Sequence, residues 1–540
     1  MVFRSPFSDV EIPDVGVHEY LFADIDEEDL DRPAFTVASS GESTSYRELL
    51  LWSGEIAGAL IARGVGAGDV VGVLSPNTPA FAAVFHGILR AGATVTTVNA
   101  LATAEEIAKQ LVDARAVLFY AFAPLADRAA EAAARAGLSD DAVLLLGADD
   151  HPGAHPAPSP SGPKADVPVQ RATDVPVQPA THVAALPYSS GTSGRPKGVM
   201  ITHRNLVANV AQVQPLSAMG RDDVVLAVLP FFHIYGMTMF LNVALRSRSS
   251  VVTMARFELR EFLEHIQRYR VTYLFVVPPM ALALARHPLV DAYDLSSLRM
   301  IVSSAAPLDR TLGEAVEARL GVPVHQGYGM TELSPVSHCV VIDRGMSLTG
   351  ERAPVNASGW AVPNTENKLI DPASGAEIPL PLEGLSEAGD LWVRGPNVMA
   401  GYLGNPEATA DSLDADGFLH TGDLVRVDPT GCVYIVDRLK ELIKYKGYQV
   451  PPAELEALLL AHPGIADVAV VGVPDVEGEE IPKAFVVLRP GHPLTPDEVM
   501  EHVNAQVAPY KRVRQVEFIA AVPKSVTGKI LRRELRGAAR

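Results

Sequence analysis

A short stretch, YSSGTSGRPKGV at residues 188–199, combines hydroxyl side chains, three glycines and Lys197. Glycines let the backbone approach a ligand closely, hydroxyls donate hydrogen bonds, and lysine adds positive charge, so the stretch suits phosphate oxygens. A Walker-type P-loop needs G-x-x-x-x-G-K followed by Ser or Thr, and the spacing after Gly191 does not fit it. The stretch therefore predicts a phosphate-binding loop unlike that of kinases and motor ATPases.

Two further stretches carry side chains suited to a nucleotide. In QGYGMTE at 326–332, two glycines leave room for a flat ring, and a following threonine could donate to a phosphate. Its last residue, Glu332, offers the hard oxygen ligands that divalent cations prefer. The sequence HTGD at 420–423 ends in Asp423, whose carboxylate could accept hydrogen bonds from both hydroxyls of a ribose. Taken alone, each stretch is also compatible with an ordinary turn.

Two lysine-bearing stretches lie towards the C-terminus. Lysine is scarce in this chain, yet DRLKELIKYKG at 437–447 holds three. The sequence PKSVTGKILRREL at 523–535 places Lys529 after a flexible Thr-Gly pair, at the start of an expected helix. A solvated basic face is the alternative interpretation of both stretches. The clustering of a scarce charged residue favours a functional role.

The composition is that of an ordinary globular protein with more than one domain. The chain has 540 residues, of which 48% are hydrophobic and 20% charged, and this length is too great for a single core. Its formal net charge of −19 argues against a nucleic acid or an anionic membrane as partner. Cys339 and Cys432 are the only cysteines, too few for a disulfide framework or a structural zinc site. A site for a polyanionic ligand must therefore be locally basic.

The sequence pattern divides the chain into two domains and a connector. Short apolar runs alternate with amphipathic stretches in the N-terminal part, which predicts parallel sheets covered by helices. Residues 151–181 are rich in Pro and Ala and contain a near-tandem octapeptide, which predicts an exposed connector. The C-terminal pattern is that of a small α+β domain. We therefore expect a large domain at 1–437 and a small one at 438–540, with a hinge at about 438–441.

One segment raises the question of a membrane span. Residues 224–245 carry no charged side chain and are long enough to cross a bilayer. Pro230, Gly236 and Asn242 interrupt the segment, and the proline would break a helix. A buried strand, a tight loop and a buried helix are therefore expected instead. The N-terminus lacks the apolar run of a signal peptide and the C-terminus lacks a peroxisomal signal, so a cytoplasmic protein is expected.

Together and in this order, the stretches resemble those of the acyl-adenylate-forming (AMP-binding) enzyme superfamily, which includes acyl-CoA ligases, adenylation domains of peptide synthetases and luciferases. The resemblance extends from about residue 20 to the C-terminus. The stretches that look closest to 4-coumarate–CoA ligases are PFFHIYGM (230–237), SSAAPL (303–308), QGYGMTELSPV (326–336) and KELIKYKGYQV (440–450).

The resemblance implies an α/β fold. It has a large N-terminal domain of α/β subdomains with parallel sheets plus a β-barrel-like part, and a small mobile α+β C-terminal domain.

The implied activity is that of an ATP-dependent carboxylic acid–CoA ligase, which uses ATP, Mg²⁺ and coenzyme A. The carboxylate first attacks the α-phosphorus of ATP and forms an acyl-AMP, and the CoA thiol then displaces AMP. The stretch 230–237 has no acid to pair with an ammonium group, so a free amino acid is expected to be a poor substrate. The resemblance to 4-coumarate–CoA ligases implies a hydroxycinnamate-like aromatic acid instead. The partners would be these small molecules, with no nucleic acid and no membrane span, and the protein would be a monomer or a homodimer.

Several alternatives stay open at this point. Within the family they are a medium- or long-chain fatty acyl-CoA ligase and an acyl-AMP ligase that loads a carrier protein. A luciferase-like oxygenase shares the same motifs. An inactive nucleotide-binding relative is disfavoured, because the charged residues of all the stretches are present.

By resemblance, one set of residues binds the nucleotide. These ATP- and AMP-binding residues are Ser189, Ser190, Gly191, Thr192, Ser193, Gly194, Lys197, Gln326, Gly327, Tyr328, Thr331, Asp423, Ile435, Arg438, Lys444 and Gln449. Lys529 would bridge the carboxylate and α-phosphate oxygens, His233 would gate the passage of the CoA thiol, and Lys440 would be the hinge residue. The expected Mg²⁺ ligands are Glu332 and Thr192.

A second set forms the acyl pocket and the route of CoA. The residues expected to line the acyl pocket are Tyr235, Met239, Val302, Ala305, Gly327, Gly329, Pro335 and Val336. Walls that are mostly small or apolar suit a flat aromatic acid. Met239 stands where plant enzymes often carry a small polar residue, which bears on the ring substituents that are accepted. The residues expected to contact CoA are Arg256, Lys446 and Gly447.

Overall fold

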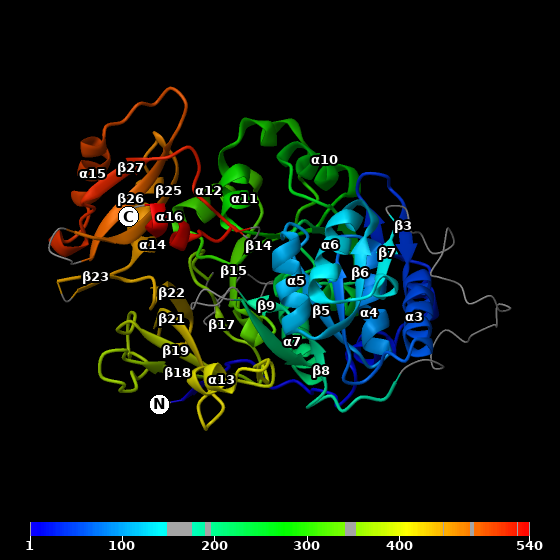
Figure 1. Ribbon diagram of the computed structural model, residues 1–540. Coiled ribbons are helices and arrows are strands. Elements are labelled where there is room, and N and C mark those ends of the chain that lie inside the picture. Colours follow the sequence, from blue (N-terminus) through cyan, green and yellow to red (C-terminus); the bar gives the residue numbers. More distant parts are fainter. Residues whose placement is uncertain are drawn as a thin grey trace.

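The larger part of the molecule holds three sheets, and a smaller part follows it from β23 onward, at the upper left of Figure 1. The structure is a computed structural model. It describes residues 2–147, 175–189, 196–340, 353–446, 448–475, 480–525 and 528–538.

The first sheet is mixed and has eight strands in the described chain. Its order is β20-β10-β8-β5-β4-β6-β7, and β9 pairs with β10. Strands β4 to β8 run parallel to one another, whereas β10 is antiparallel to β8, β9 and β20. The bounds are β4 (Val70–Leu74), β5 (Thr94–Val98), β6 (Ala116–Phe122), β7 (Val143–Leu146), β8 (Val183–Ala185), β9 (Tyr188–Ser189), β10 (Lys197–Thr202) and β20 (Gly401–Tyr402).

The second sheet has nine strands in the order β17-β16-β15-β14-β13-β11-β12-β2-β3. Its centre, from β15 to β2, is parallel, and the strands at both edges are antiparallel. The bounds are β2 (Pro33–Val37), β3 (Ser43–Ser45), β11 (Val224–Ala227), β12 (Ser250–Thr253), β13 (Tyr273–Val276), β14 (Met300–Ser303), β15 (Val324–Gly329), β16 (Val336–Cys339) and β17 (Trp360–Ala361).

The third sheet is antiparallel and has the order β1-β18-β19-β21-β22. Its bounds are β1 (Phe3–Arg4), β18 (Glu366–Ile370), β19 (Gly389–Arg394), β21 (Leu419–Val427) and β22 (Val433–Arg438). The described strands leave this sheet open, with β1 and β22 at its edges, so the barrel-like part expected from the sequence is an open sheet rather than a closed barrel.

Helices cover the two large sheets, as the alternating sequence pattern predicts. Helices α5 and α6 pack on β4 and β6 through an apolar cluster and lie in front of the first sheet in Figure 1. Capping boxes at Ser45–Glu48 and Thr103–Glu106 fix the starts of α3 and α5. The helix bounds are α1 (Val17–Phe22), α2 (Glu27–Leu30), α3 (Tyr46–Ala62), α4 (Pro79–Arg90), α5 (Ala104–Asp113), α6 (Ala126–Ala136), α7 (His203–Ser217), α8 (Ile234–Thr238), α9 (Ala244–Arg246), α10 (Leu259–Tyr269), α11 (Pro278–Arg286), α12 (Arg310–Leu320) and α13 (Pro406–Ser412).

The smaller part has its own hydrophobic clusters and the α+β pattern that the sequence predicts. A hairpin of β23 and β24 precedes a three-stranded sheet of order β25-β26-β27. The bounds are β23 (Ile443–Tyr445), β24 (Tyr448–Val450), α14 (Pro452–Leu460), β25 (Ile465–Pro474), β26 (Glu480–Leu488), α15 (Pro496–Asn504), β27 (Gln515–Phe518) and α16 (Arg532–Ala538).

The apolar segment 224–245 folds as strand β11, a loop, α8, a π-helical turn at Met239–Val243 and α9. Pro230 lies in the loop, where its carbonyl accepts a hydrogen bond from the N–H of His233 at 3.2 Å. Among the described residues, no helix is long and apolar enough to cross a membrane. The expectation of a strand, a loop and a helix is therefore confirmed.

The C-terminal end of the connector expected at 151–181 differs from the prediction. Residues 175–181 are not an exposed linker, because Val175 N–H donates to the Arg90 carbonyl at 2.9 Å and Pro179 is buried. Two valines of the octapeptide, Val175 and Val177, pack near Gly92 and Gly16, which explains why this end is held against the larger part. Residues 148–174 lie outside the described residues.

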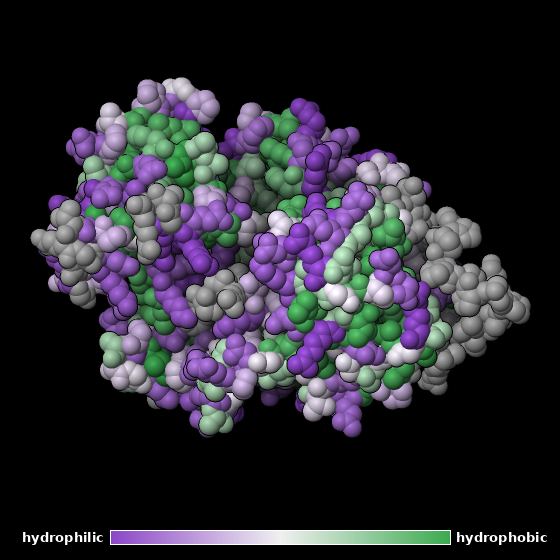
Figure 2. Space-filling model, viewed as in Figure 1, coloured by the Kyte–Doolittle hydropathy of each residue, from purple (hydrophilic) through white to green (hydrophobic). Residues whose placement is uncertain are grey.

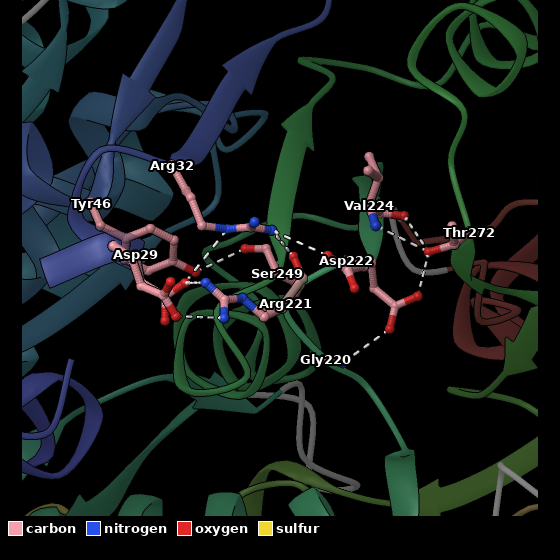
Figure 3. A network of polar contacts seen from close by, with 11 residues as sticks. Asp29, Arg32, Tyr46, Gly220, Arg221, Asp222, Val224, Ser249 and Thr272 are labelled. Atoms are coloured by element: carbon pink, nitrogen blue, oxygen red, sulfur yellow. Dashed lines mark hydrogen bonds and ion pairs between the residues drawn. The ribbon is translucent and has the colours of Figure 1, made fainter. Parts of the chain in front are cut away.

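A polar network ties the N-terminal segment to one edge of the second sheet (Figure 3). Arg221 donates to the buried Asp29 carboxylate at 2.8 Å, and the guanidinium of Arg32 contacts both residues. At the start of β11, Thr272 donates to Asp223 at 2.8 Å. These contacts join the starts of β11 and β13, and the chain after β11 carries His233, whose surroundings are described below.

Candidate active site

An aromatic residue, an acid and a cation meet where the second and third sheets face each other. The Tyr328 hydroxyl donates to Asp423 Oδ2 at 2.6 Å, and Arg438 Nε lies 3.0 Å from Asp423 Oδ1. The pairing of β21 with β22 sets Asp423 opposite Arg438. Gly422, inside β21 and next to the acid, adopts φ +68°, a backbone conformation that favours glycine. Three stretches that are distant in the sequence thus form one cluster.

The charges of this cluster are fixed by burial. Burial, followed by the Asp423 carboxylate, raises the pKa of Tyr328 well above its usual value, so its phenol remains a neutral donor. The Asp423 carboxylate also raises the pKa of Arg438. Each carboxylate oxygen can accept a second hydrogen bond, so Asp423 can still receive two hydroxyl donors such as those of a ribose.

A second cluster joins the phosphate-binding stretch to Glu332. The hydroxyl of Tyr402, on β20, donates to Glu332 Oε1 at 2.9 Å. The ammonium of Lys197 lies 4.6 Å from the centroid of the Tyr402 ring, because β10 and β20 are paired. Ser189 pairs with Lys197 across β9 and β10, and its buried hydroxyl has no partner in the described part of the chain. The residues of the loop itself, Ser190, Gly191, Thr192, Ser193 and Gly194, lie outside the described residues.

The stretch 326–336 is held rigidly from several sides. Both ends of the Gln326 side-chain amide bond to the backbone. The amide accepts from the N–H of Leu308 and donates to the carbonyls of Leu308 and Val355. A Cβ on Gly329 would lie 1.9 Å from the Pro335 carbonyl oxygen, so only glycine fits there. Thr331 begins the short helical turn Thr331–Leu333 that carries Glu332.

The residues expected to line the acyl pocket come from segments that are in contact. The Thr238 hydroxyl donates to the Ser334 carbonyl at 2.9 Å and joins α8 to the segment of Pro335 and Val336. The Ser304 hydroxyl donates to the Gly327 carbonyl at 2.8 Å and joins β14, which carries Val302, to β15.

The individual pocket residues differ in exposure. Tyr235, Met239, Val302 and Pro335 are buried, Gly327, Gly329 and Val336 are half-buried, and Ala305 is exposed. The hydroxyl of Tyr235 has no hydrogen-bond partner in the described chain, although it is buried. A buried hydroxyl left without a partner costs free energy, so this group is suited to bind a polar ligand atom.

His233 lies beside the expected pocket, at the start of α8. Its Nδ1 accepts from the N–H of Tyr235 at 3.3 Å. Burial lowers the pKa of His233 to about 4, so its imidazole is neutral at pH 7.

Lys529 is brought from the smaller part towards the Asp423 cluster. A Cβ on Gly528 would lie 3.2 Å from the side chain of Pro279, so this segment rests against α11 of the larger part. Burial lowers the pKa of Lys529, and the charge of Arg438 lowers it further, whereas the carboxylates of Glu441 and Asp423 oppose this. The ammonium of Lys529 is therefore partly desolvated, and its pKa responds to the charges of Arg438 and Asp423.

The other expected residues differ in their exposure. Lys444, Lys446 and Gln449 are exposed on the β23–β24 hairpin, and Lys440 is exposed just before it. Arg256 is exposed on the loop after β12, and Ile435 is half-buried on β22. Gly447 lies outside the described residues. In Figure 2 a furrow separates the smaller part from the α10–α11 region, and hydrophobic and hydrophilic side chains border it on both sides.

No group of three or more His, Cys, Asp or Glu side chains suited to a metal ion occurs among the described residues. Glu332, the last residue of the 326–332 stretch, contributes a buried carboxylate that Tyr402 joins to the phosphate-binding strand β10. One carboxylate completed by phosphate oxygens and water is a common way to hold Mg²⁺ at a nucleotide site. The donor set therefore fits Mg²⁺ that arrives with a nucleotide.

Three residues were not anticipated from the sequence. Tyr402 bonds Glu332, and Asp390 accepts from the N–H of Gly422 at 3.1 Å behind Asp423. The stretch GDLWVRGPNVMAGY at 389–402 contains both and was a possible signal. Asp437, beside Arg438, is the third.

Comparisons with known proteins agree with this geometry. A family model described as AMP-binding enzyme matches residues 22–403, and one described as AMP-binding enzyme C-terminal domain matches residues 454–529. The chain therefore belongs to the AMP-binding enzyme family and carries both of the family's domains.

Relatives and solved structures cover nearly the whole chain. A 4-coumarate–CoA ligase of Oryza sativa subsp. japonica is 42% identical over 99% of this chain and 94% of its own. A 4-coumarate–CoA ligase of Vanilla planifolia is 40% identical over 99% of this chain and 96% of its own. The ATP-bound structure of MatB from Rhodopseudomonas palustris, at 29% identity, covers 97% of this chain and 99% of that chain with a TM-score of 0.85. The apo structure of the same MatB matches this chain with a TM-score of 0.74.

Proposed function

We propose that the protein is an ATP-dependent carboxylic acid–CoA ligase that works through an acyl-adenylate. The observation that carries the proposal is the Tyr328–Asp423–Arg438 cluster, together with the contact that sets the Lys529-bearing segment of the smaller part against α11 of the larger part. The relatives named 4-coumarate–CoA ligase support this chemistry. They do not favour the fatty acyl or carrier-protein alternative.

In the first half-reaction the acid attacks the α-phosphorus of ATP and pyrophosphate leaves. The reaction is chiefly a matter of positioning and of stabilising negative charge on oxygens. Asp423 would accept the ribose hydroxyls, and Tyr328 would lie against the adenosine. Lys197 and Ser189, at the two ends of the phosphate-binding loop, would hold the departing phosphates. Lys529 would bridge the carboxylate and α-phosphate oxygens.

Glu332 would hold Mg²⁺, which supplies positive charge against the phosphate oxygens when it is bound. Tyr402 keeps the Glu332 carboxylate oriented by its hydrogen bond. Thr192, the other expected ligand, remains a proposal.

In the second half-reaction the CoA thiol attacks the acyl carbon and AMP leaves. His233 would border the passage of the thiol as a neutral group, since burial keeps its pKa at about 4. Lys446 and Arg256 are exposed in this arrangement. These two residues and Gly447 would contact CoA only after a rotation of the small domain. The higher TM-score with the ATP-bound than with the apo structure of MatB supports assigning the present arrangement to the first half-reaction.

The hinge for this rotation would be Lys440, with the large domain at 1–437 and the small domain at 438–540. Lys444 and Gln449 would contact AMP from the hairpin after the hinge. The cytoplasmic location and the monomeric or dimeric state remain predictions from the sequence.

The acid would be a hydroxycinnamate-like aromatic acid. The pocket segments offer apolar walls at Met239 and Val302, and the buried Tyr235 hydroxyl lacks a partner in the described chain. A phenolic hydroxyl on the substrate ring would satisfy it, whereas a fatty acyl chain would leave it unsatisfied.

The experiment is an assay of cinnamate, 4-coumarate, palmitate and an amino acid with Mg-ATP, with and without CoA. The proposal predicts AMP and thioester from 4-coumarate, and little of either from palmitate or the amino acid. AMP that accumulates equally without CoA, with no thioester, would contradict it.

A further inference from the structure

One side chain of the larger part reaches across the proposed hinge. Asp437, near the end of β22, is only 6% exposed. Its Oδ1 accepts a hydrogen bond from the N–H of Arg438 at 2.7 Å, and its Oδ2 accepts one from the N–H of Ala453 at 2.9 Å. Ala453 is the second residue of α14, beyond Lys440 in the chain. A single carboxylate therefore joins the two parts.

The contact supplies a cap that α14 does not provide for itself. The N-cap residue of α14 is Pro451, and it makes no side-chain capping bond. The first N–H groups of a helix lack partners within the helix and form its positive end, where a carboxylate is favourable. Asp437 thus caps α14 from the other side of the hinge.

An arginine extends this link towards Lys529. Arg532 is the first residue of α16, and its Nε lies 2.9 Å from Glu441 Oε2. Its Nη2 lies 2.9 Å from the carboxylate of Glu456 on α14. Because Arg532 follows Lys529 by three residues, the position of α14 is transmitted to the segment that carries Lys529.

Burial raises the pKa of Asp437, and the positive charge of Arg532 opposes this effect. The carboxylates of Glu441 and Glu456 share the same guanidinium. Asp437 is therefore a buried acid, and two groups of the smaller part, the N–H of Ala453 and the guanidinium of Arg532, stabilise its carboxylate. Movement of α14 away from β22 would remove its bond to Ala453.

We propose that Asp437 is a positioning residue for adenylation, and that its carboxylate holds α14 so that Lys529 lies near Asp423. This inference rests on the proposed function, because it assumes two half-reactions with different domain arrangements. In a rotation about Lys440, Asp437 stays with β22 whereas Ala453 moves with α14. The contact therefore favours the first arrangement and is absent from the second.

The test compares Asp437→Ala and Asp437→Asn in two single-turnover assays with the full-length enzyme. The first measures pyrophosphate release from Mg-ATP and 4-coumarate, and the second measures thioester formation from preformed coumaroyl-AMP and CoA. Asp437→Ala should slow the first reaction about tenfold or more through the lost charge-assisted bonds, and leave the second within about twofold. Asp437→Asn should have a smaller effect, since its amide keeps one acceptor oxygen for two N–H groups.

Thr495→Ala is the matched control. Thr495 caps α15 of the same part through its bond to the N–H of Glu498, so its substitution removes a helix cap without altering the Asp437 carboxylate. Its loss should lower the melting temperature but leave the ratio of the two rates unchanged. The rate of tryptic cleavage after the exposed Lys440 gives a readout independent of activity, and it should rise in Asp437→Ala.

Equal slowing of both half-reactions in both Asp437 variants would assign Asp437 a purely structural role and overturn the inference. An unchanged first half-reaction would also overturn it. An unaltered enzyme that performs neither reaction would contradict the proposed function itself, and the inference would fall with it.

Discussion

The hydroxyl of Tyr402 lies 2.9 Å from Glu332 Oε1 and donates a hydrogen bond to it. The same ring lies beneath the ammonium of Lys197, 4.6 Å from its centroid. A residue that follows Glu332 by seventy positions therefore links the phosphate-binding strand to the acid expected to hold Mg²⁺.

Tyr402→Phe keeps the ring under Lys197 and removes only the hydroxyl. Glu332 then loses a donor that orients it, and a hydrogen bond to a charged group contributes about 1.5–3 kcal/mol. We expect pyrophosphate release to slow by roughly tenfold or more, measured at saturating acid. Tyr269→Phe is the control, because its hydroxyl bonds the Ala38 carbonyl far from the nucleotide cluster. Equal rates in Tyr402→Phe and the unaltered enzyme would separate Tyr402 from catalysis.

Tyr235→Phe tests the substrate class. The buried hydroxyl has no partner in the described chain, so a substrate phenol is expected to bond it. Its removal should lower kcat/KM for 4-coumarate by about fivefold or more and change the value for cinnamate little. The ratio of the two values is the measurement. A similar loss for both acids would mean that Tyr235 only packs against the ring.

The stretch from Glu332 to Pro335 and Val336 lacks the deletion that would widen the ring end of the pocket in plant relatives. Pro335 is buried against the 326–329 segment. This end of the pocket is therefore expected to be narrow. We predict good activity with 4-coumarate and poor activity with the dimethoxylated sinapate, and deletion of Val336 should relax the exclusion. Efficient activation of sinapate by the unaltered enzyme would show that the pocket is wider than proposed.

The sequence predicted the regular elements well, because hydrophobic periodicity and capping residues are local signals. The strand, loop and helix expected in the apolar segment 224–245 match β11, the loop of Pro230 and α8. The connector was drawn too long at its C-terminal end, since the packing of Val175 depends on Arg90 and Gly92, which are distant in the sequence.

The motifs likewise named Asp423, Arg438 and Tyr328 before the structure brought them together. They missed Tyr402 and Asp437, because these residues act through contacts between strands and across the hinge. Their neighbours in the sequence give no sign of a partner seventy or sixteen residues away.

Four buried histidines should make stability depend on pH. Burial lowers the pKa of His86 and His233 to about 4, and that of His203 and His338 to about 3. As pH falls through about 6.5 the unfolded chain takes up protons that the folded chain refuses, so stability is lost from there down towards pH 4. The melting temperature should fall between pH 7 and pH 5.

His86→Gln checks the source of this effect. The variant should be less stable at pH 7, because His86 Nε2 bonds the Leu241 carbonyl at 3.0 Å, but its melting temperature should fall less steeply towards pH 5. An unchanged slope would mean that His86 does not contribute.

The central claim is that one enzyme performs two half-reactions with different faces of its small domain. The direct measurement is a pair of single-turnover assays, acyl-AMP formation and thioester formation from preformed acyl-AMP, on Lys529→Ala and Lys446→Ala. Lys529→Ala should slow the first by roughly 100- to 1000-fold, which corresponds to about 2.7–4 kcal/mol for a lost contact to a developing oxyanion, and spare the second. Lys446→Ala should do the reverse. Equal losses in both half-reactions for both variants would mean a single static site and contradict the claim.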